Sequence, residues 1–127
     1  MCNRLHKKSK NKFRRIKDEG VGWKLFNKRY RDDYCPVCRY GYELKIGETI
    51  TWDIVKDGDG FCFFLKKADA VKAVKTSWLS PLVVVCKISY SGGLGTFEET
   101  GDLSWPPGIR FAIAKKFTIL KETKEKR

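Results

Sequence analysis

The apolar positions of this chain fall into short runs, most of which alternate with polar residues or consist of β-branched and aromatic side chains. Such runs predict strands, because alternation with a period of two places one set of side chains on one face of a sheet. FCFFL, at residues 61–65, is apolar throughout and predicts a strand that is buried on both faces. The strands predicted in this way span residues 21–26, 40–46, 50–54, 61–65, 82–90 and, as one long strand or two short ones, 109–120.

One segment follows a helical period instead. Between residues 67 and 78 the apolar side chains recur at helical spacing, and Ser80-Pro81 ends the segment. The pattern predicts one amphipathic helix that points its apolar side chains inward and its charged ones outward. The inward residues would be Ala68, Val71, Ala73, Val74 and Trp78, and the outward residues Lys67, Asp69, Lys72 and Lys75.

Glycine-rich and polar segments separate these runs. DGDG (57–60) predicts a tight turn, SGGLG (91–95) a flexible turn or bulge, and residues 96–108 a loop that ends in Pro106-Pro107-Gly108. Several strands and one helix predict an α+β fold, a mostly antiparallel sheet with one principal helix. We expect a single domain at residues 20–120, flanked by a basic N-terminal arm (1–19) and a basic C-terminal tail (121–127) that frays.

The charge is strongly positive and lies at the two ends. Lys and Arg number 27 against 15 Asp and Glu, which gives a net charge of +12. Residues 1–34 carry a net charge of +8, residues 35–114 of zero and residues 115–127 of +4. With 42% hydrophobic residues the chain can bury a core, and it has neither a signal peptide nor an apolar run of the ~20 residues that a membrane helix needs. These features predict a cytoplasmic globular protein.

Clustered positive charge indicates a polyanionic partner, nucleic acid first, although solvated ends that serve only solubility are the alternative. The sequence holds no base-reading motif, so the contacts would go to phosphates. Trp105, in the LSWPPG loop, is predicted to be exposed and to contact a partner, whereas the other tryptophans lie on apolar faces. The residues predicted to contact phosphates are Lys7, Lys8, Lys10, Lys12, Arg14, Arg15, Lys17, Arg29 and Arg31.

The candidate chemistry is sparse. Cys35-Pro-Val-Cys38 has metal-ligand spacing, but a closed zinc site needs four ligands and only Cys2 and His6 could complete it. We therefore expect reduced thiols and no zinc. A single His, with no nucleophile motif and no phosphate-binding glycine loop, argues against catalysis, and Glu48, Glu98 and Glu99 are expected in solvated loops. No catalytic residue, metal ion or cofactor is assigned, and the composition favours a non-enzymatic protein.

Five segments follow one another along the chain: GVGWKLF (20–26), YGYELKIGETI (40–50), DGDGFCFFLKKADAVKAV (57–74), VVVCKISYSGGLGTFEE (83–99) and IAKKFTIL (113–120). Over about residues 20–120, their order resembles the layout of small phage and prophage proteins. Many relatives with this layout carry His where this chain has Cys62, which argues against a catalytic site there. The resemblance implies a phage setting, in which small proteins often act on host machinery, and hence an anti-defence role of the anti-CRISPR type.

Three functional hypotheses follow. The first is a phage-like, non-enzymatic protein that binds nucleic acid or a host nucleoprotein complex. The second is a protein–protein inhibitor that makes no contact with nucleic acid. The third is an ADP-ribosyltransferase-like enzyme, because DGFCFFLKKADAV also resembles the strand and helix of that class, with Glu98 or Glu99 offered as its late-strand glutamate.

Overall fold

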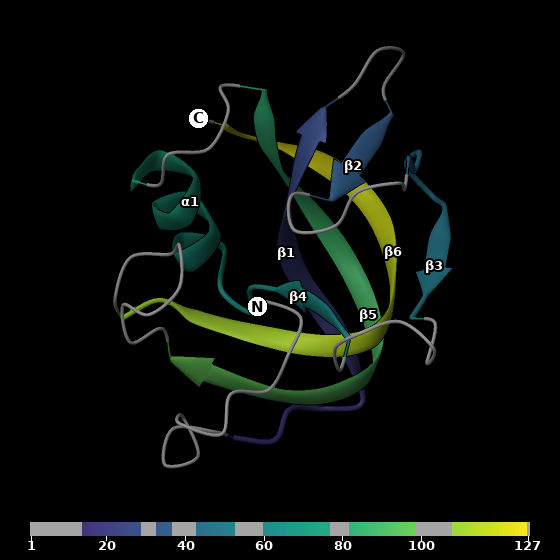
Figure 1. Cartoon of the computed structure of the whole chain (residues 1–127), viewed down its shortest axis with the longest axis vertical. Coiled ribbons are helices and arrows are strands. Elements are labelled where there is room, and N and C mark those ends of the chain that lie inside the picture. Colours follow the sequence, from purple (N-terminus) through teal and green to yellow (C-terminus); the bar gives the residue numbers. More distant parts are fainter. Residues whose placement is uncertain are drawn as a thin grey trace.

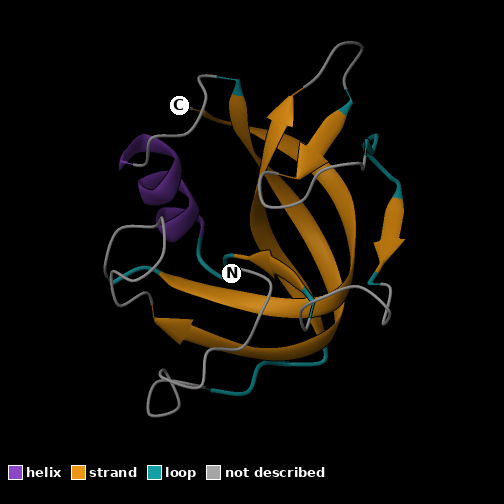
Figure 2. Cartoon of the chain, viewed as in Figure 1, coloured by secondary structure: helices purple, strands orange, loops and turns teal. Residues whose placement is uncertain are grey.

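In the part of the chain that the structure describes, the protein is an antiparallel sheet of two long, strongly curved strands and four shorter ones, with one helix (Figures 1 and 2). The computed structural model describes residues 14–28, 33–36, 43–52, 60–76, 82–98 and 108–126. The strands run in the order β2-β1-β5-β6-β3, and β4 pairs with β6 outside this path. The elements are β1 (Glu19–Lys28), β2 (Tyr34–Pro36), β3 (Thr49–Thr51), β4 (Phe61–Phe63), α1 (Lys67–Thr76), β5 (Val83–Glu98) and β6 (Arg110–Lys126).

The sheet closes on itself through a backbone bridge just after β4. Trp23 of β1 donates to the Phe64 carbonyl at 2.8 Å, and Phe64 donates back to the Trp23 carbonyl at 2.7 Å. Strands β1, β5, β6 and β4 therefore form a ring. Gly22 makes this approach possible, because a Cβ there would lie 2.5 Å from the Phe63 ring and 2.9 Å from the Phe64 carbonyl oxygen.

Two apolar clusters occupy the two faces of the sheet. On the face covered by α1, which we call the helix face, the side chains of Trp23, Leu25 and Val85 pack with α1. The opposite face, which we call the far face, carries an aromatic cluster. There the Phe61 ring stands edge-on to both Trp52 and Phe117, each at 4.9 Å between centroids. Such pairs contribute about 0.5–1.5 kcal/mol each beyond simple burial.

The structure confirms the mostly antiparallel sheet with one helix, and it confirms the strands predicted near residues 21–26, 61–65, 82–90 and 109–120. Residues 61–64 are buried throughout, as the apolar run predicts. The helix begins at the predicted Lys67 and ends at Thr76, and Trp78 lies outside the described residues. Its inward stripe differs, because Ala70, Ala73 and Val74 are buried while Ala68 is exposed.

For SGGLG the sequence predicted a turn or a bulge, and the bulge is confirmed. The segment continues β5, with a register shift between Gly93 and Gly95. The prediction for the C-terminal end was wrong. Residues 121–126 do not form a frayed tail but continue β6, where Glu122 pairs with Cys86 of β5. The Tyr34 hydroxyl donates to Glu122 at 2.7 Å, and Lys28 forms an ion pair with it at 2.9 Å, so this polar strand end is anchored by contacts with β1 and β2.

Candidate nucleic-acid interface

The basic residues that precede β1 are held against the sheet. In this lead-in segment (residues 14–18), Arg14 donates to the Thr96 carbonyl at 3.0 Å and accepts from the Thr96 N–H at 2.8 Å. The Asp18 carbonyl accepts from Gly93 at 3.1 Å, and the Ile16 side chain packs against the far-face cluster. The side chains of Arg14, Arg15 and Lys17 are exposed along a backbone that β5 fixes.

Two glycines in β5 let basic residues of the lead-in segment and of β6 approach this strand closely. A Cβ on Gly93 would collide with the Lys17 carbonyl oxygen, and one on Gly92 would lie 2.8 Å from the Lys115 Cβ. Gly92 also has a φ of 65°, a conformation that favours glycine. The glycines thus let Lys17 and Lys115 flank β5 on its two sides, and Lys116 follows Lys115 along β6.

These cations are not neutralised within the part of the chain that the structure describes. Lys28 and Lys45 form ion pairs with Glu122 and Asp33, at 2.9 and 2.7 Å. Ion pairs of that kind are absent, among the described residues, from Arg14, Arg15, Lys17, Lys115 and Lys116. Asp18 and Glu19 are the carboxylates next to them in the chain, and both are exposed.

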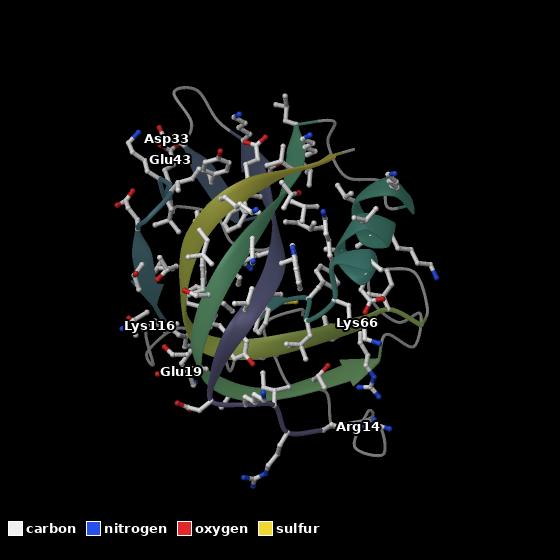
Figure 3. All side chains as sticks on the ribbon, turned by 180° about the vertical axis from the view of Figure 1, so that it is seen from behind. Arg14, Glu19, Asp33, Glu43, Lys66 and Lys116 are labelled. Carbon is white, nitrogen blue, oxygen red and sulfur yellow. The ribbon has the colours of Figure 1, made fainter. Side chains whose placement is uncertain are left out.

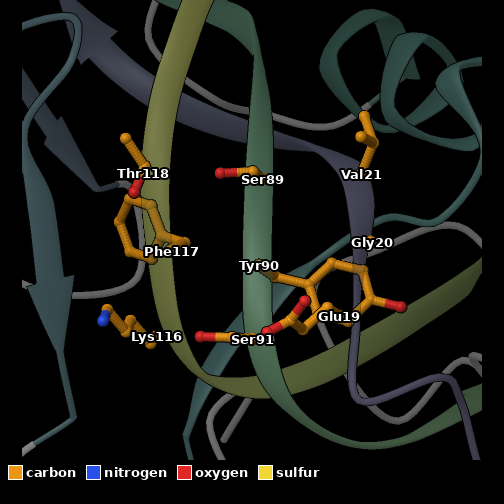
Figure 4. A pocket seen from close by; sticks show the side chains of 9 residues that line it. All are labelled: Glu19, Gly20, Val21, Ser89, Tyr90, Ser91, Lys116, Phe117 and Thr118. Atoms are coloured by element: carbon orange, nitrogen blue, oxygen red, sulfur yellow. The ribbon is translucent and has the colours of Figure 1, made fainter.

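An open cleft of about 440 Å³ lies beside the lead-in segment, and we call it the serine trough (Figure 4). Its floor is formed by Ser89 and Ser91 of β5. The register places Glu19 and Val21 of β1 opposite these serines on one side, and Lys116 and Thr118 of β6 opposite them on the other. Since side chains alternate along a strand, the trough lies on the helix face, beyond the end that α1 covers.

Two aromatic residues of these strands, Tyr90 and Phe117, also line the trough, but both are almost wholly buried and belong to the far-face cluster. The Tyr90 ring packs against Gly20, where a Cβ would come within 2.9 Å of the hydroxyl oxygen. Burial, and next the Asp18 charge, raise the pKa of Tyr90. Besides these two aromatic residues, Gly20 and Val21, the trough is lined by three hydroxyl residues, one lysine and one glutamate.

Figure 3 shows how the labelled charges are arranged. Lys116 and Glu19 both lie at the left of that view, and Arg14 lies at the lower right. In the strand register, Glu19 and Lys116 are both partners of Ser91. A lysine and a glutamate thus flank one serine on its two neighbouring strands.

One lysine lies inside the fold and cannot contribute to this surface. Lys24 is 4% exposed, and its ammonium donates to the Cys62 carbonyl at 2.5 Å. The ammonium lies 6.0 Å from the centroid of the Phe26 ring and 5.6 Å from that of Phe117. Burial lowers the pKa of Lys24 to about 8, against an opposing electrostatic effect of Cys62.

The predicted phosphate-contacting residues divide into two groups. The structure brings Arg14, Arg15 and Lys17 together along β5. The others, and Trp105, lie outside the described residues, namely Lys7, Lys8, Lys10, Lys12, Arg29 and Arg31. Sequence reasoning missed Lys115, Lys116 and the two trough serines. The signal for the lysines was present, because that pair interrupts the alternation of residues 109–120.

The cysteine and glutamate candidates gain no chemistry from the structure. Cys35, Cys62 and Cys86 are buried and form no disulfide among the described residues, whereas Cys2, His6 and Cys38 lie outside them. Burial, and next the Glu122 charge, raise the pKa of Cys86 to about 12. Within the described ranges, no group of three or more His, Cys, Asp or Glu side chains could hold a metal ion. Glu98 is the last residue of β5, and its side chain lies outside the described part of the chain, as does Glu99.

The described part of the chain contains no helix that is long and apolar enough to span a membrane. Comparison with protein-family models, with curated proteins and with solved structures finds no match.

Proposed function

We propose that this protein binds nucleic acid through its phosphates. The contact residues are Arg14, Arg15 and Lys17 of the lead-in segment and Lys115 and Lys116 of β6. The observation that carries the proposal is that these residues border β5 between Ser91 and Thr96 and, within the described part of the chain, make no ion pair. Uncompensated cations on a fixed backbone attract a polyanion and release its bound counterions.

The net charge of +12 supports the same conclusion, since it exceeds what solubility requires of a small domain. Contacts of this kind position a nucleic acid without reading its sequence. They also weaken steeply as salt rises, because released counterions must be taken up again when the complex dissociates.

The test is a titration of labelled oligonucleotides across a salt series, with the variant Arg14→Gln/Arg15→Gln/Lys17→Gln. The affinity falls as salt rises, and loss of three phosphate contacts should make the slope of log K against log salt less steep by about 2 for a single strand. The matched control is Lys66→Gln/Lys75→Gln/Lys124→Gln, which removes three other exposed cations and the same net charge. Equal weakening by both variants would reject this assignment, and no binding by the wild type would reject the proposal.

Free nucleic acid and a host nucleoprotein complex present the same phosphates, and the second fits the phage setting that the sequence resemblance implies. Co-purification with and without nuclease separates these two targets. A protein partner that stays bound after nuclease treatment, with no oligonucleotide binding by the wild type, would favour the protein–protein inhibitor instead.

A further inference from the structure

We infer that the serine trough seats a single strand of RNA by its sugar–phosphate backbone, with Glu19 accepting a hydrogen bond from a ribose hydroxyl. This inference rests on the proposed function and adds the class of nucleic acid to it. It starts from the position of the trough, which begins at the residue after the lead-in segment and shares Lys116 with the cations described above.

The size of the trough suits one strand. Its two walls stand on the outer two of three adjacent strands, which places them about 10 Å apart. The volume of about 440 Å³ lies in the range of small-ligand sites, roughly 300–1,000 Å³. A strand that runs along β5 would therefore place one or two nucleotides in it.

The lining favours sugar and phosphate over bases. Single-stranded nucleic acids are usually held by bases that stack on exposed aromatic rings. Tyr90 and Phe117 are the aromatic residues at the trough, and they are 6% and 1% exposed, with their rings on the far face. The floor instead offers the hydroxyls of Ser89 and Ser91, which can donate to phosphate or exchange hydrogen bonds with a sugar hydroxyl.

The carboxylate decides between RNA and DNA. Glu19 and Lys116 flank Ser91 on the two neighbouring strands. A phosphate can pair with Lys116 but is repelled by Glu19. DNA has no sugar hydroxyl that could donate to the Glu19 carboxylate, so this repulsion is not offset. The ribose 2′-hydroxyl is a donor as well as an acceptor, and it is the group by which proteins distinguish RNA from DNA. An RNA strand can satisfy both walls of the trough at once.

The experiment compares matched single-stranded RNA and DNA oligonucleotides, and duplex RNA, against the wild type, Glu19→Gln and the control Glu43→Gln. Glu43 is an exposed glutamate outside the trough, so its substitution changes the net charge by the same amount. We expect the wild type to bind single-stranded RNA about tenfold more tightly than DNA, the ratio that one hydrogen bond to a charged group can supply. Duplex RNA should bind more weakly than the single strand.

Glu19→Gln should tighten DNA binding and bring the RNA-to-DNA ratio close to one, because repulsion of phosphate and the charged acceptor are lost together. Glu43→Gln should leave the ratio unchanged. Ser91→Val, which fills the floor and suits a strand, should weaken RNA binding while the far-UV spectrum is retained. Equal affinity for RNA and DNA in the wild type, or a ratio unchanged in Glu19→Gln, would overturn the trough inference but not the proposed function. Failure to bind any oligonucleotide would overturn both.

Discussion

The helix face of the sheet has two ends that share the same strands and the same alternation, yet they differ in what covers them. At one end, Leu25 and Val85 are 3% and 0% exposed beneath α1. At the other, their counterparts on the same strands are Val21, which is 43% exposed, and the half-buried Ser89. On β5 the residue type changes from Val to Ser where the helix cover stops, whereas on β1 an apolar residue remains and is exposed. One strand can thus build the core with one half and an uncovered surface with the other.

The largest effect should come from placing the same charge at both ends of this face. Val85→Asp buries an unpaired carboxylate under α1 and should cost about 4 kcal/mol or more, enough to unfold most of a marginally stable domain. Ser89→Asp lies four residues further along the same strand and face, and should change the free energy of unfolding by less than about 0.5 kcal/mol. Urea denaturation checks both values. The comparison fails if the two variants are destabilised alike.

A second contrast concerns two lysines of the sheet, Lys24 in the interior and Lys116 in the trough. Burial lowers the pKa of Lys24 to about 8 from an ordinary 10.5. Between these values the unfolded chain binds more protons than the native one, so stability rises with pH, by up to about 3 kcal/mol. Below pH 8 the cost of burying the charge is present in full.

Unfolding of the wild type and of Lys24→Met should be followed between pH 7 and 10.5. The raised pKa of Cys86 acts in the opposite direction above pH 9, where the unfolded thiol ionises and native stability falls. This effect of Cys86 is the same in the wild type and in Lys24→Met, so it cancels in the difference between their free energies of unfolding. As pH rises, the free energy of unfolding of the wild type should increase relative to that of Lys24→Met. If the two proteins show the same dependence of stability on pH, Lys24 does not titrate between pH 7 and 10.5.

The smallest effect on stability should come from substitution of Lys116, the exposed lysine that is compared with Lys24. Lys116→Gln removes one uncompensated cation, so it should leave the midpoint of unfolding unchanged and lower the salt slope of single-stranded binding by about 0.7. Lys75→Gln, on the exposed side of α1, serves as the control. A change in stability without a change in slope would place Lys116 in the fold rather than in the interface.

The strand cores could be predicted from the sequence because burial fixes their alternation. The run at residues 61–65 and the β-branched run at 82–90 show this most clearly. Where burial is partial the pattern misled. Leu44 and Ile46 share a parity, yet Leu44 is 8% exposed and Ile46 is 49% exposed, because the chain turns at Gly47, which has a φ of 92°.

The candidate site was only partly predictable. The cations of the lead-in segment were visible as charge, but their fixed placement depends on pairing with β5, some 80 residues away in sequence. The sequence gives no reason to select Ser89 and Ser91, since they form the floor of a trough only when β1 and β6 stand on either side of them.

The sequence by itself determined the class of fold, the position of the helix and the strong positive charge, because alternation, helical period and charge are properties of neighbouring residues. Only the tertiary structure decided that the glycine segment of β5 is strand, that the C-terminal lysines extend β6, and that one end of the helix face stays uncovered. Those outcomes depend on which strands meet, and strand pairing is set by contacts between residues far apart in the chain.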